Sequence, residues 1–348
     1  MGKVMKREKE KKKGVTAVIG ILLLLLAAAA VVSVLVGRYS ITPKVLFEIL
    51  FRGGSAVSED AEAASLVLFE ARLARICAAV LIGASLSAAG AAYQGIFRNP
   101  MVSPDILGAA TGASFGAALA ILLGGNALAV QISAFCFGLA AVAAAYMASS
   151  VLSGESGGAT LTLVLTGMVI AALFSAFISI IKFVGDPYDT LPTITFWLMG
   201  GLTYVTRSDL YIMLIPFAAG MIPLMLLRWR LNILSFDDKE AAALGVDTKR
   251  TRAVIILCAT LMSSSSVAVG GMIGWVGLIV PHIARMIAGP DYSRMLPCSV
   301  LIGGLFLLVV DDLARCLFAQ ELPLGVLTAI IGAPFFLYLM FKGKKSFL

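Results

Sequence analysis

Arginines and aspartates beside two apolar segments are the residues of this sequence best placed to do chemistry. Arg72 and Arg75 stand three positions apart, and Asp311 and Asp312 precede Arg315 by four and three positions. These spacings place each group on one face of a helix. A guanidinium can bind a carboxylate through two parallel hydrogen bonds, so Arg72 and Arg75 could form a patch outside the membrane that receives an acidic partner.

Each group also has a simpler interpretation. Arg72 and Arg75 could extend their charged ends to a membrane surface while their aliphatic parts remain in lipid. Asp311 and Asp312 could neutralise Arg315 within one helix, or they could belong to a proton relay. Carboxylates in an apolar segment are costly and are usually paired or functional. The sequence leaves these alternatives open.

Polar and helix-breaking residues gather in two further places. The first holds four of them within eleven positions: Gln94, Asn99, Pro100 and Pro104. It predicts the end of one helix and the start of another, because proline lacks the N–H that a helix interior needs. The second is Pro281 followed by His282, where we expect a kinked helix whose freed carbonyl meets a polar group. An ordinary turn and a structural histidine are the simpler alternatives.

The sequence gives little support for a metal site or a disulfide bond. The five cysteines are far apart, each in an apolar stretch: Cys77, Cys136, Cys258, Cys298 and Cys316. There is no CxxC pair, and the single histidine cannot complete a zinc site. We expect the cysteines to be small buried hydrophobic residues, and we expect no metal and no directly bound cofactor.

The composition indicates which solvent surrounds the elements that carry these residues. In 348 residues, 60% are hydrophobic and 14% are charged, with a mean hydropathy of +0.98. Soluble domains have about 45–50% hydrophobic residues and about 25% charged residues. A soluble enzyme, a disordered chain and a nucleic-acid binder are therefore excluded. Long apolar runs without alternation predict helices rather than a barrel, and thus an all-α polytopic membrane protein.

Ten apolar segments are long enough to cross a bilayer, which takes about 20 residues. They are 15–36, 73–93, 105–124, 127–150, 160–182, 209–227, 252–269, 271–288, 296–314 and 325–341. Nineteen of the 27 Lys and Arg residues fall on the side of the N-terminus and eight on the other, which predicts that both termini are cytoplasmic.

The domain organisation follows from these segments. We expect a basic cytoplasmic tail at 1–14, a single ten-helix domain at 15–342 and a short tail at 343–348, in a multi-pass protein of the plasma (inner) membrane. The glycine-rich segments 105–124 and 271–288 are the least regular. Many small residues inside the segments predict a tightly packed bundle.

Two segments outside the lipid are long enough to fold by themselves. The outer segment 43–64 begins with a short amphipathic piece. The inner segment 231–250 predicts a helix that Ser235 or Asp237 caps and that continues to Leu244, where Gly245 supplies a left-handed conformation. A second short helix is expected after Asp247. Together these features predict a rigid cytoplasmic knob.

Several strings occur in the order and spacing of a known family. They are RLAR (72–75), the Gln94 to Gly108 segment with RNP and SP, FWLMGG (196–201), LG (244–245), GLIVPHIAR (277–285), and Asp311 with Arg315 before ELPLG (321–325). In these strings, and from about 15 to 342, the chain resembles the permease subunits of ABC importers for iron-siderophore, haem and cobalamin.

The resemblance implies a homodimer with the pathway along its axis, two cytoplasmic ATPase subunits that use ATP, and an extracytoplasmic binding protein. It implies that Arg72, Arg75 and Arg315 meet acidic residues of the binding protein. It assigns to the ATPase contact Phe236, Asp238, Lys239, Glu240, Ala243, Leu244 and Gly245. It assigns to the pathway or its structural motifs Gln94, Asn99, Pro100, Pro104, Pro281, His282 and Asp311. Departures from the family pattern are Ala74 for proline, Trp275 for phenylalanine and the additional acid Asp312.

Three classes of function are compared. A permease without an active site of its own fits the lack of a P-loop, because its energy must come from a partner. An ion-coupled secondary transporter would need carboxylates near the bilayer midplane, whereas Asp311 and Asp312 lie near a segment end. A membrane-embedded enzyme would need a nucleophile and a base that converge. Membrane lipid is an expected partner and nucleic acid is not; the identity of the chelate, and a homodimer against a heterodimer, stay open.

Overall fold

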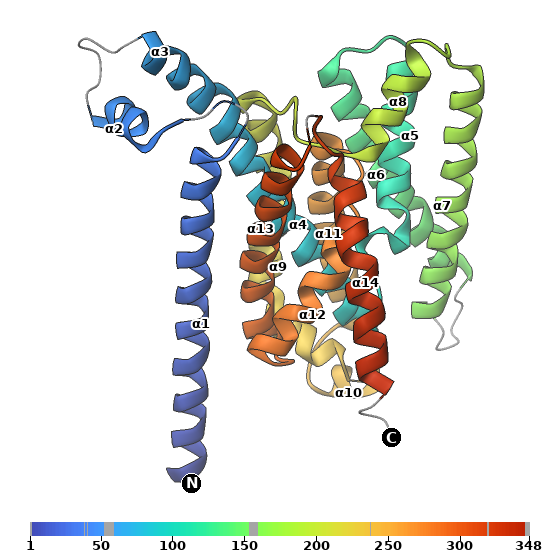
Figure 1. Ribbon diagram of the computed structural model, residues 1–348. Helices are drawn as coiled ribbons and strands as arrows, with labels where there is room; N and C mark the ends of the chain where they lie inside the picture. The colour runs from blue at the N-terminus through green and yellow to red at the C-terminus, as the bar shows by residue number, and fades with distance from the viewer. Residues whose placement is uncertain are drawn as a thin grey trace.

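The computed structural model describes residues 2–37, 39, 41–51, 59–152, 159–236, 238–318 and 320–344, and in these the regular structure is helical. Figure 1 shows the helices running side by side between two ends of a bundle. We call one the α3 end, which holds α2, α3 and α8. The other is the α10 end, which holds α10, the start of α1 and the end of α14.

Ten helices correspond to the ten predicted segments. They are α1 (Gly2–Leu35), α4 (Leu73–Ile96), α5 (Ala109–Leu122), α6 (Ala127–Leu152), α7 (Ala159–Val184), α9 (Arg207–Leu234), α11 (Thr248–Gly270), α12 (Val276–Ala288), α13 (Tyr292–Cys316) and α14 (Leu324–Lys344). Helix α1 starts at Gly2, so the segment predicted as a basic tail continues the first helix. Because α1 starts and α14 ends at the same end (Figure 1), the chain crosses an even number of times. That this end faces the cytoplasm stays a prediction.

Shorter elements lie between the long helices. They are α2 (Pro43–Phe51), α3 (Glu59–Leu66), the π-helix η1 (Val67–Arg72), the 3-10 helix η2 (Pro104–Leu107), α8 (Thr190–Met199) and α10 (Asp238–Ala243). Helix α2 confirms the short amphipathic piece expected after Pro43. The structure adds α3, η1 and α8, which the sequence analysis did not predict.

The ten helices differ in length. Seven of the described helices are long and apolar enough to cross a membrane: α1, α6, α7, α9, α11, α13 and α14. Helix α4 has 24 residues, or about 36 Å at 1.5 Å per residue. Helices α5 and α12 have only 14 and 13 residues. The predicted spans 105–124 and 271–288 are therefore wrong in their first turns.

Backbone conformation explains both short helices. Before α12, Gly271 and Trp275 have φ angles of +67° and +70°, which no right-handed helix allows. Before α5, Gly108 has a φ of +81° and follows the 3-10 turn that Pro104 starts. Each half-length helix thus follows irregular backbone, which membrane proteins tolerate only where protein or a cavity covers it.

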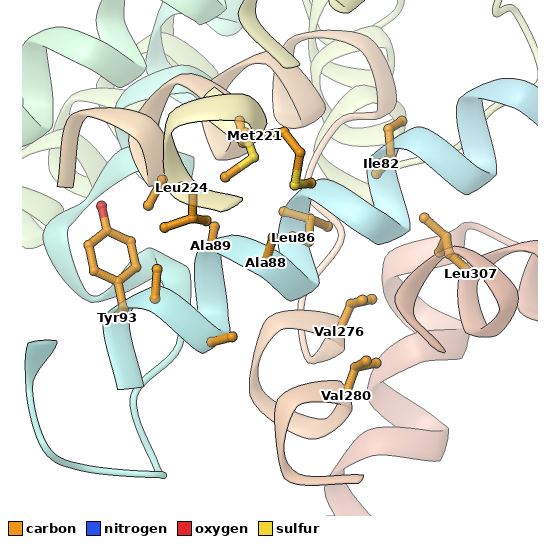
Figure 2. Close-up of a cluster of buried hydrophobic side chains, with 14 of the residues drawn as sticks. Ile82, Leu86, Ala88, Ala89, Tyr93, Met221, Leu224, Val276, Val280 and Leu307 are labelled. Carbon is orange, nitrogen blue, oxygen red and sulfur yellow. The ribbon is translucent and has the colours of Figure 1, made fainter. Parts of the chain in front are cut away.

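Helix α4 is the centre of the bundle and packs against α9, α11, α12 and α13. Figure 2 shows its apolar face meeting side chains from three of them. The labelled residues are Ile82, Leu86, Ala88, Ala89 and Tyr93 of α4, Met221 and Leu224 of α9, Val276 and Val280 of α12, and Leu307 of α13.

Small residues bring these backbones together. A Cβ atom at Gly90 would lie 1.8 Å from the carbonyl oxygen of Gly277, and one at Gly83 would lie 2.2 Å from that of Gly303. Any other residue would push α4 away from α12 and α13.

The cysteines only partly match the expectation of burial. Cys258 and Cys298 are buried, whereas Cys77, Cys136 and Cys316 are exposed on the outside of the bundle. An apolar thiol on that surface is compatible with lipid, because lipid removes the need to bury it. The prediction of burial is wrong for these three.

Candidate functional sites at the two ends of the bundle

The α3 end contains a buried network of ion pairs. The Nε atom of Arg75 lies 3.0 Å from each carboxylate oxygen of Asp311, and its Nη2 lies 2.9 Å from Oδ1. Its Nη1 donates to Oε2 of Glu321 at 2.9 Å. Asp311 is fully buried. Arg75 therefore joins α4 to α13 and to the segment before α14.

Arg315 extends the network along α13. Its Nε lies 3.3 Å from Oδ2 of Asp311, and its Nη2 pairs with Asp312. The same Nη2 donates to Ser33 Oγ of α1 at 2.8 Å, and Ser33 donates in turn to Asp312 at 2.7 Å. The intrahelical pairing inferred from the spacing is present, and Ser33 ties it to α1.

Arg72 is held differently, at the C-terminal end of the π-helix η1. Its guanidinium donates to the carbonyl oxygens of Val34 and Tyr39, and within the described residues it forms no ion pair. Burial, followed by the positive charge of Arg315, lowers the pKa of Arg72. Arg72 is thus the one arginine of this cluster whose guanidinium, among the described residues, hydrogen-bonds only to peptide carbonyls.

The three arginines surround a cavity of about 250 Å³. Its other polar lining residues include Thr203 and Glu321. The relative exposures of Arg72, Arg75 and Arg315 are 5%, 9% and 6%. The arginines gather at one end of the bundle, and their side chains are buried and face a cavity. The physical reason is that carboxylates and carbonyls from distant segments fold over them. That the arginines receive an acidic partner from outside stays a prediction.

The coupling segment at the α10 end is an exposed helix with a defined cap. Gly245, with a φ of +78°, donates its N–H to the carbonyl of Ala242, and Val246 donates to that of Ala241. These two bonds form a Schellman motif, in which a left-handed residue closes the helix. Ala241 and Val246 are buried, as the hydrophobic contact of that motif requires.

The exposed face of this segment presents the residues assigned from the resemblance. Phe236 and Leu244 are 51% and 60% exposed, and Lys239, Glu240 and Ala243 are exposed too. The side chain of Asp238 and all of Asp237 lie outside the described residues.

Two boundaries of the predicted knob are corrected. Helix α10 ends at Ala243, one residue before Leu244. The expected second short helix is the start of the long helix α11, which Asp247 caps by accepting a bond from the N–H of Arg250 at 3.0 Å.

The motif after α4 forms a tight turn at the same end. Gln94 is buried and its amide nitrogen donates to the carbonyl of Leu278 at 3.2 Å. Asn99 accepts from the N–H of Met101 at 2.9 Å, so Asn99 and Pro100 shape the turn. Pro104 lies against Gly277, where a Cβ atom would come within 2.4 Å of its ring.

Pro281 lies inside α12, as the motif predicts, but His282 has a different setting from the one expected. Pro281 leaves the carbonyl of Gly277 without its helical donor, and this oxygen faces Gly90. In the described part of the chain the imidazole of His282 forms no hydrogen bond. The expectation that it satisfies the freed carbonyl is not supported.

Several residues of these sites could not be assigned from the sequence. The partner of Arg75 is 236 positions away at Asp311, and Ser33 is 279 positions from Asp312. Asn232, Arg285 and Tyr292 also meet at the α10 end. The only signal in the sequence was the presence of polar residues at segment ends. Over the described residues, no group of three or more His, Cys, Asp or Glu could hold a metal ion.

A bundle with half-length helices, an ion-paired cavity at one end and an exposed capped helix at the other defines a polytopic membrane transport protein. The family described as the FecCD transport family matches residues 22–342. The chain belongs to this family.

Curated relatives extend over most of the chain. The molybdate import system permease protein MolB of Haemophilus influenzae is 40% identical over 91% of this chain and 93% of its own length. The probable iron chelatin transport system permease protein of Helicobacter pylori strain 26695 is 38% identical over 82% of this chain and 86% of its own length. The cobalamin import system permease protein BtuC of Halobacterium salinarum is 38% identical over 80% of this chain and 74% of its own length.

A solved structure gives the same result. Described as an inward-facing conformation of an ABC transporter, it aligns with a TM-score of 0.83 and 38% identity over 94% of this chain and 99% of its own. The chain is thus a permease subunit of an ABC importer, located in the inner membrane and not an enzyme; the ATPase is a separate subunit. The alternative of an ion-coupled secondary transporter is not supported.

Proposed function

We propose that two copies of this chain form a translocation pathway that receives substrate at the α3 end and is driven from the α10 end. The observation that carries the proposal is that two unlike features lie at opposite ends of one bundle. One is the arginine-lined cavity, and the other is the exposed helix α10. Both termini would then be cytoplasmic, and membrane lipid would cover the outer surface.

The α3 end would receive an extracytoplasmic binding protein. Arg75 and Arg315 already have carboxylate partners, so they would bind an incoming acid only by sharing those partners. Within the described residues Arg72 has only carbonyl partners, and a carboxylate is a stronger acceptor for a guanidinium than a carbonyl is. Arg72 would therefore be the first of the three to engage an acidic side chain of the binding protein.

The α10 end would receive two ATPase subunits, one for each copy of the chain. Phe236 and Leu244 present apolar surface in a segment that we expect to lie outside the lipid, and such surface marks an interaction site. The Schellman cap fixes the backbone around Leu244. A rigid contact can transmit motion that a flexible loop would absorb.

The substrate proposed first is a metal chelate: iron-siderophore, haem or cobalamin. Relatives named for iron chelatin and cobalamin support it. Molybdate is the second candidate, because MolB is 40% identical over 91% of the chain. The two differ in size and charge, since molybdate is a small oxyanion and the chelates are large.

Uptake by the reconstituted importer tests the substrate class. Vesicles would contain the permease and its ATPase subunits, with ATP enclosed and the cognate binding protein outside. Labelled iron-siderophore, haem, cobalamin and molybdate would be offered separately. Uptake of one of the chelates is expected. Uptake of molybdate alone would replace the first candidate with the second, and uptake of none of them would contradict both.

A further inference from the structure

A chain of side-chain contacts leads from the end of the coupling segment into the centre of the bundle. Helix α10 packs against α9 and α11. The last turn of α9 carries Asn232, and Leu231 and Leu234 beside it are completely buried. A displacement of α10 can therefore reach this turn through the packing of α10 against α9.

Asn232 fixes the end of α9 to the start of α13. Its side-chain oxygen accepts from the N–H of Tyr292 at 2.8 Å, and its nitrogen donates to Asp291 Oδ1 at 2.7 Å. These partners determine the orientation of the amide, because a peptide N–H can only donate and a carboxylate can only accept. Partial burial would raise the pKa of Asp291, but hydrogen bonds from Ser293 and Asn232 lower it below its usual value. The carboxylate therefore stays ionised, and the contact that Asn232 makes between α9 and α13, called the Asn232 joint below, is tight.

The same turn of α9 is also tied to the turn after α4. Arg98, a non-glycine residue with a φ of +51°, donates from Nε to the carbonyl of Leu234 at 2.9 Å. Carbonyls at a helix C-terminus lack helical donors, and a guanidinium there is favoured by the helix dipole. A left-handed conformation at an arginine costs energy, and the bond to Leu234 offsets part of that cost.

The path continues from Tyr292 to the centre. Arg285 Nη2 lies 3.3 Å from the hydroxyl of Tyr292 and 3.5 Å from Oε1 of Gln94. Gln94 Nε2 donates to the carbonyl of Leu278 in α12 and, at 3.5 Å, to that of Val102. The bonds of Arg285 are long compared with the tight bonds of Asn232. The path thus has a firm joint at Asn232 and an adjustable one at Arg285.

We infer that Asn232, Arg285 and Gln94 are positioning residues for coupling, which pass the displacement of α10 through Tyr292 to the half-length helix α12. The inference rests on the proposed role of α10. Asn232 moves the start of α13 together with α9. Arg285 belongs to α12, so its contact with Tyr292 carries the movement to that helix. Its contact with Gln94 then links α12 to α4 and to the turn before η2.

The test measures coupling as substrate uptake per ATP hydrolysed, in vesicles that contain the full importer. Asn232→Leu removes both joint bonds at similar volume, and Arg285→Met removes the adjustable contacts. Each should lower the ratio at least fivefold while ATP hydrolysis stays within twofold of wild type. Leu226→Ala, on the exposed side of the same helix α9 and away from the path, should leave the ratio unchanged.

The double variant separates a path from independent structural damage. Asn232 and Arg285 do not touch, but both contact Tyr292. Independent effects would multiply, whereas residues of one path should give a double variant no worse than the worse single variant. A multiplied loss would overturn the inference, and so would an unchanged ratio in Asn232→Leu.

Two controls keep the outcome interpretable. If Asn232→Leu fails to assemble, Gln94→Glu replaces it: it keeps the acceptor for Arg285 but loses the donor to Leu278, so uncoupling is still expected, and full coupling would contradict the path. Failure of the proposed function looks different. In that case the wild type shows no ATP-dependent uptake, or variants of α10 itself leave coupling intact.

Discussion

Arg72 differs from the other two arginines at the cavity in what its charge meets. Arg75 holds together α4, α13 and the segment before α14 through Asp311 and Glu321. Removing one partner of a buried ion pair costs about 3–5 kcal/mol. Charge reversal at Arg75 would therefore damage the fold as well as any docking. Arg72, whose partners are two carbonyls, allows a cleaner test.

Arg72→Gln should weaken docking of the loaded binding protein about tenfold at low salt, because it removes a charge that an acidic partner would engage. Affinity would be measured on the purified dimer at two salt concentrations, since screening weakens the contribution of a charge. Arg207→Gln is the matched control: it also removes a guanidinium at the α3 end, but one that is half exposed and paired with Glu70. Equal affinities for wild type and Arg72→Gln at low salt would contradict the docking assignment.

Asp311 and Asp312 are expected to fix arginines and not to carry protons. Asp311 pairs with Arg75 and Arg315, and Asp312 pairs with Arg315. Replacing both by asparagine should reduce ATP-dependent uptake without making it depend on a proton gradient. Uptake would be measured with and without an uncoupler at constant ATP. The interpretation fails if wild-type uptake collapses with the uncoupler and the double variant lacks that uptake.

At the scale of elements, Gly245 decides whether α10 ends in a rigid cap. A left-handed conformation costs about 1–2 kcal/mol for other residues, and valine resists it further because its side chain is β-branched. A Cβ atom at Gly245 would meet no other atom within 4 Å, so any effect comes from the backbone.

Gly245→Val should therefore lower uptake and loosen the link between ATP hydrolysis and transport. Gly124→Val is the matched control, because Gly124 has a φ of +70°, also lies in open space and belongs to the α5–α6 turn far from α10 along the chain. Expression and dimer formation are compared first. Normal transport by Gly245→Val would show that the 236–247 segment does not couple the ATPase.

The existence of the ten long apolar helices could be predicted from the sequence, while their lengths could not. Long apolar runs need a helix in lipid, and ten such runs became ten helices. The early turns of 105–124 and 271–288 were misassigned because the glycines that break them are also common inside packed membrane helices. Apolar composition alone does not distinguish a glycine in a close contact, such as Gly90, from one with positive φ, such as Gly271.

The candidate sites were predictable in part for the same reason. Local features were readable: the spacing of Asp311 and Asp312 to Arg315 gave their pairing, and Gly245 gave the cap. Contacts across the bundle could not be predicted, because the ion pair of Arg75 with Asp311 depends on how α4 and α13 pack. That packing is set by small residues such as Gly83 and Gly303 rather than by the charges.

For the whole molecule, the arrangement in Figure 1 leads to a prediction about sidedness. Thr203 lines the cavity at the α3 end, and Lys239 is exposed at the α10 end. In a background without the five cysteines, a membrane-impermeant thiol reagent added outside intact cells should label Thr203→Cys and leave Lys239→Cys unlabelled. Opening the membrane should expose Lys239→Cys. The reverse pattern would invert the proposed topology.

The source of energy is the central claim for the whole molecule, and one reconstitution tests it directly. The permease would be placed in vesicles with and without its ATPase subunits, with the loaded binding protein outside. We expect uptake only when the ATPase subunits and ATP are both present, and no effect of an uncoupler. Uptake by the permease alone, driven by an imposed proton gradient, would contradict the account.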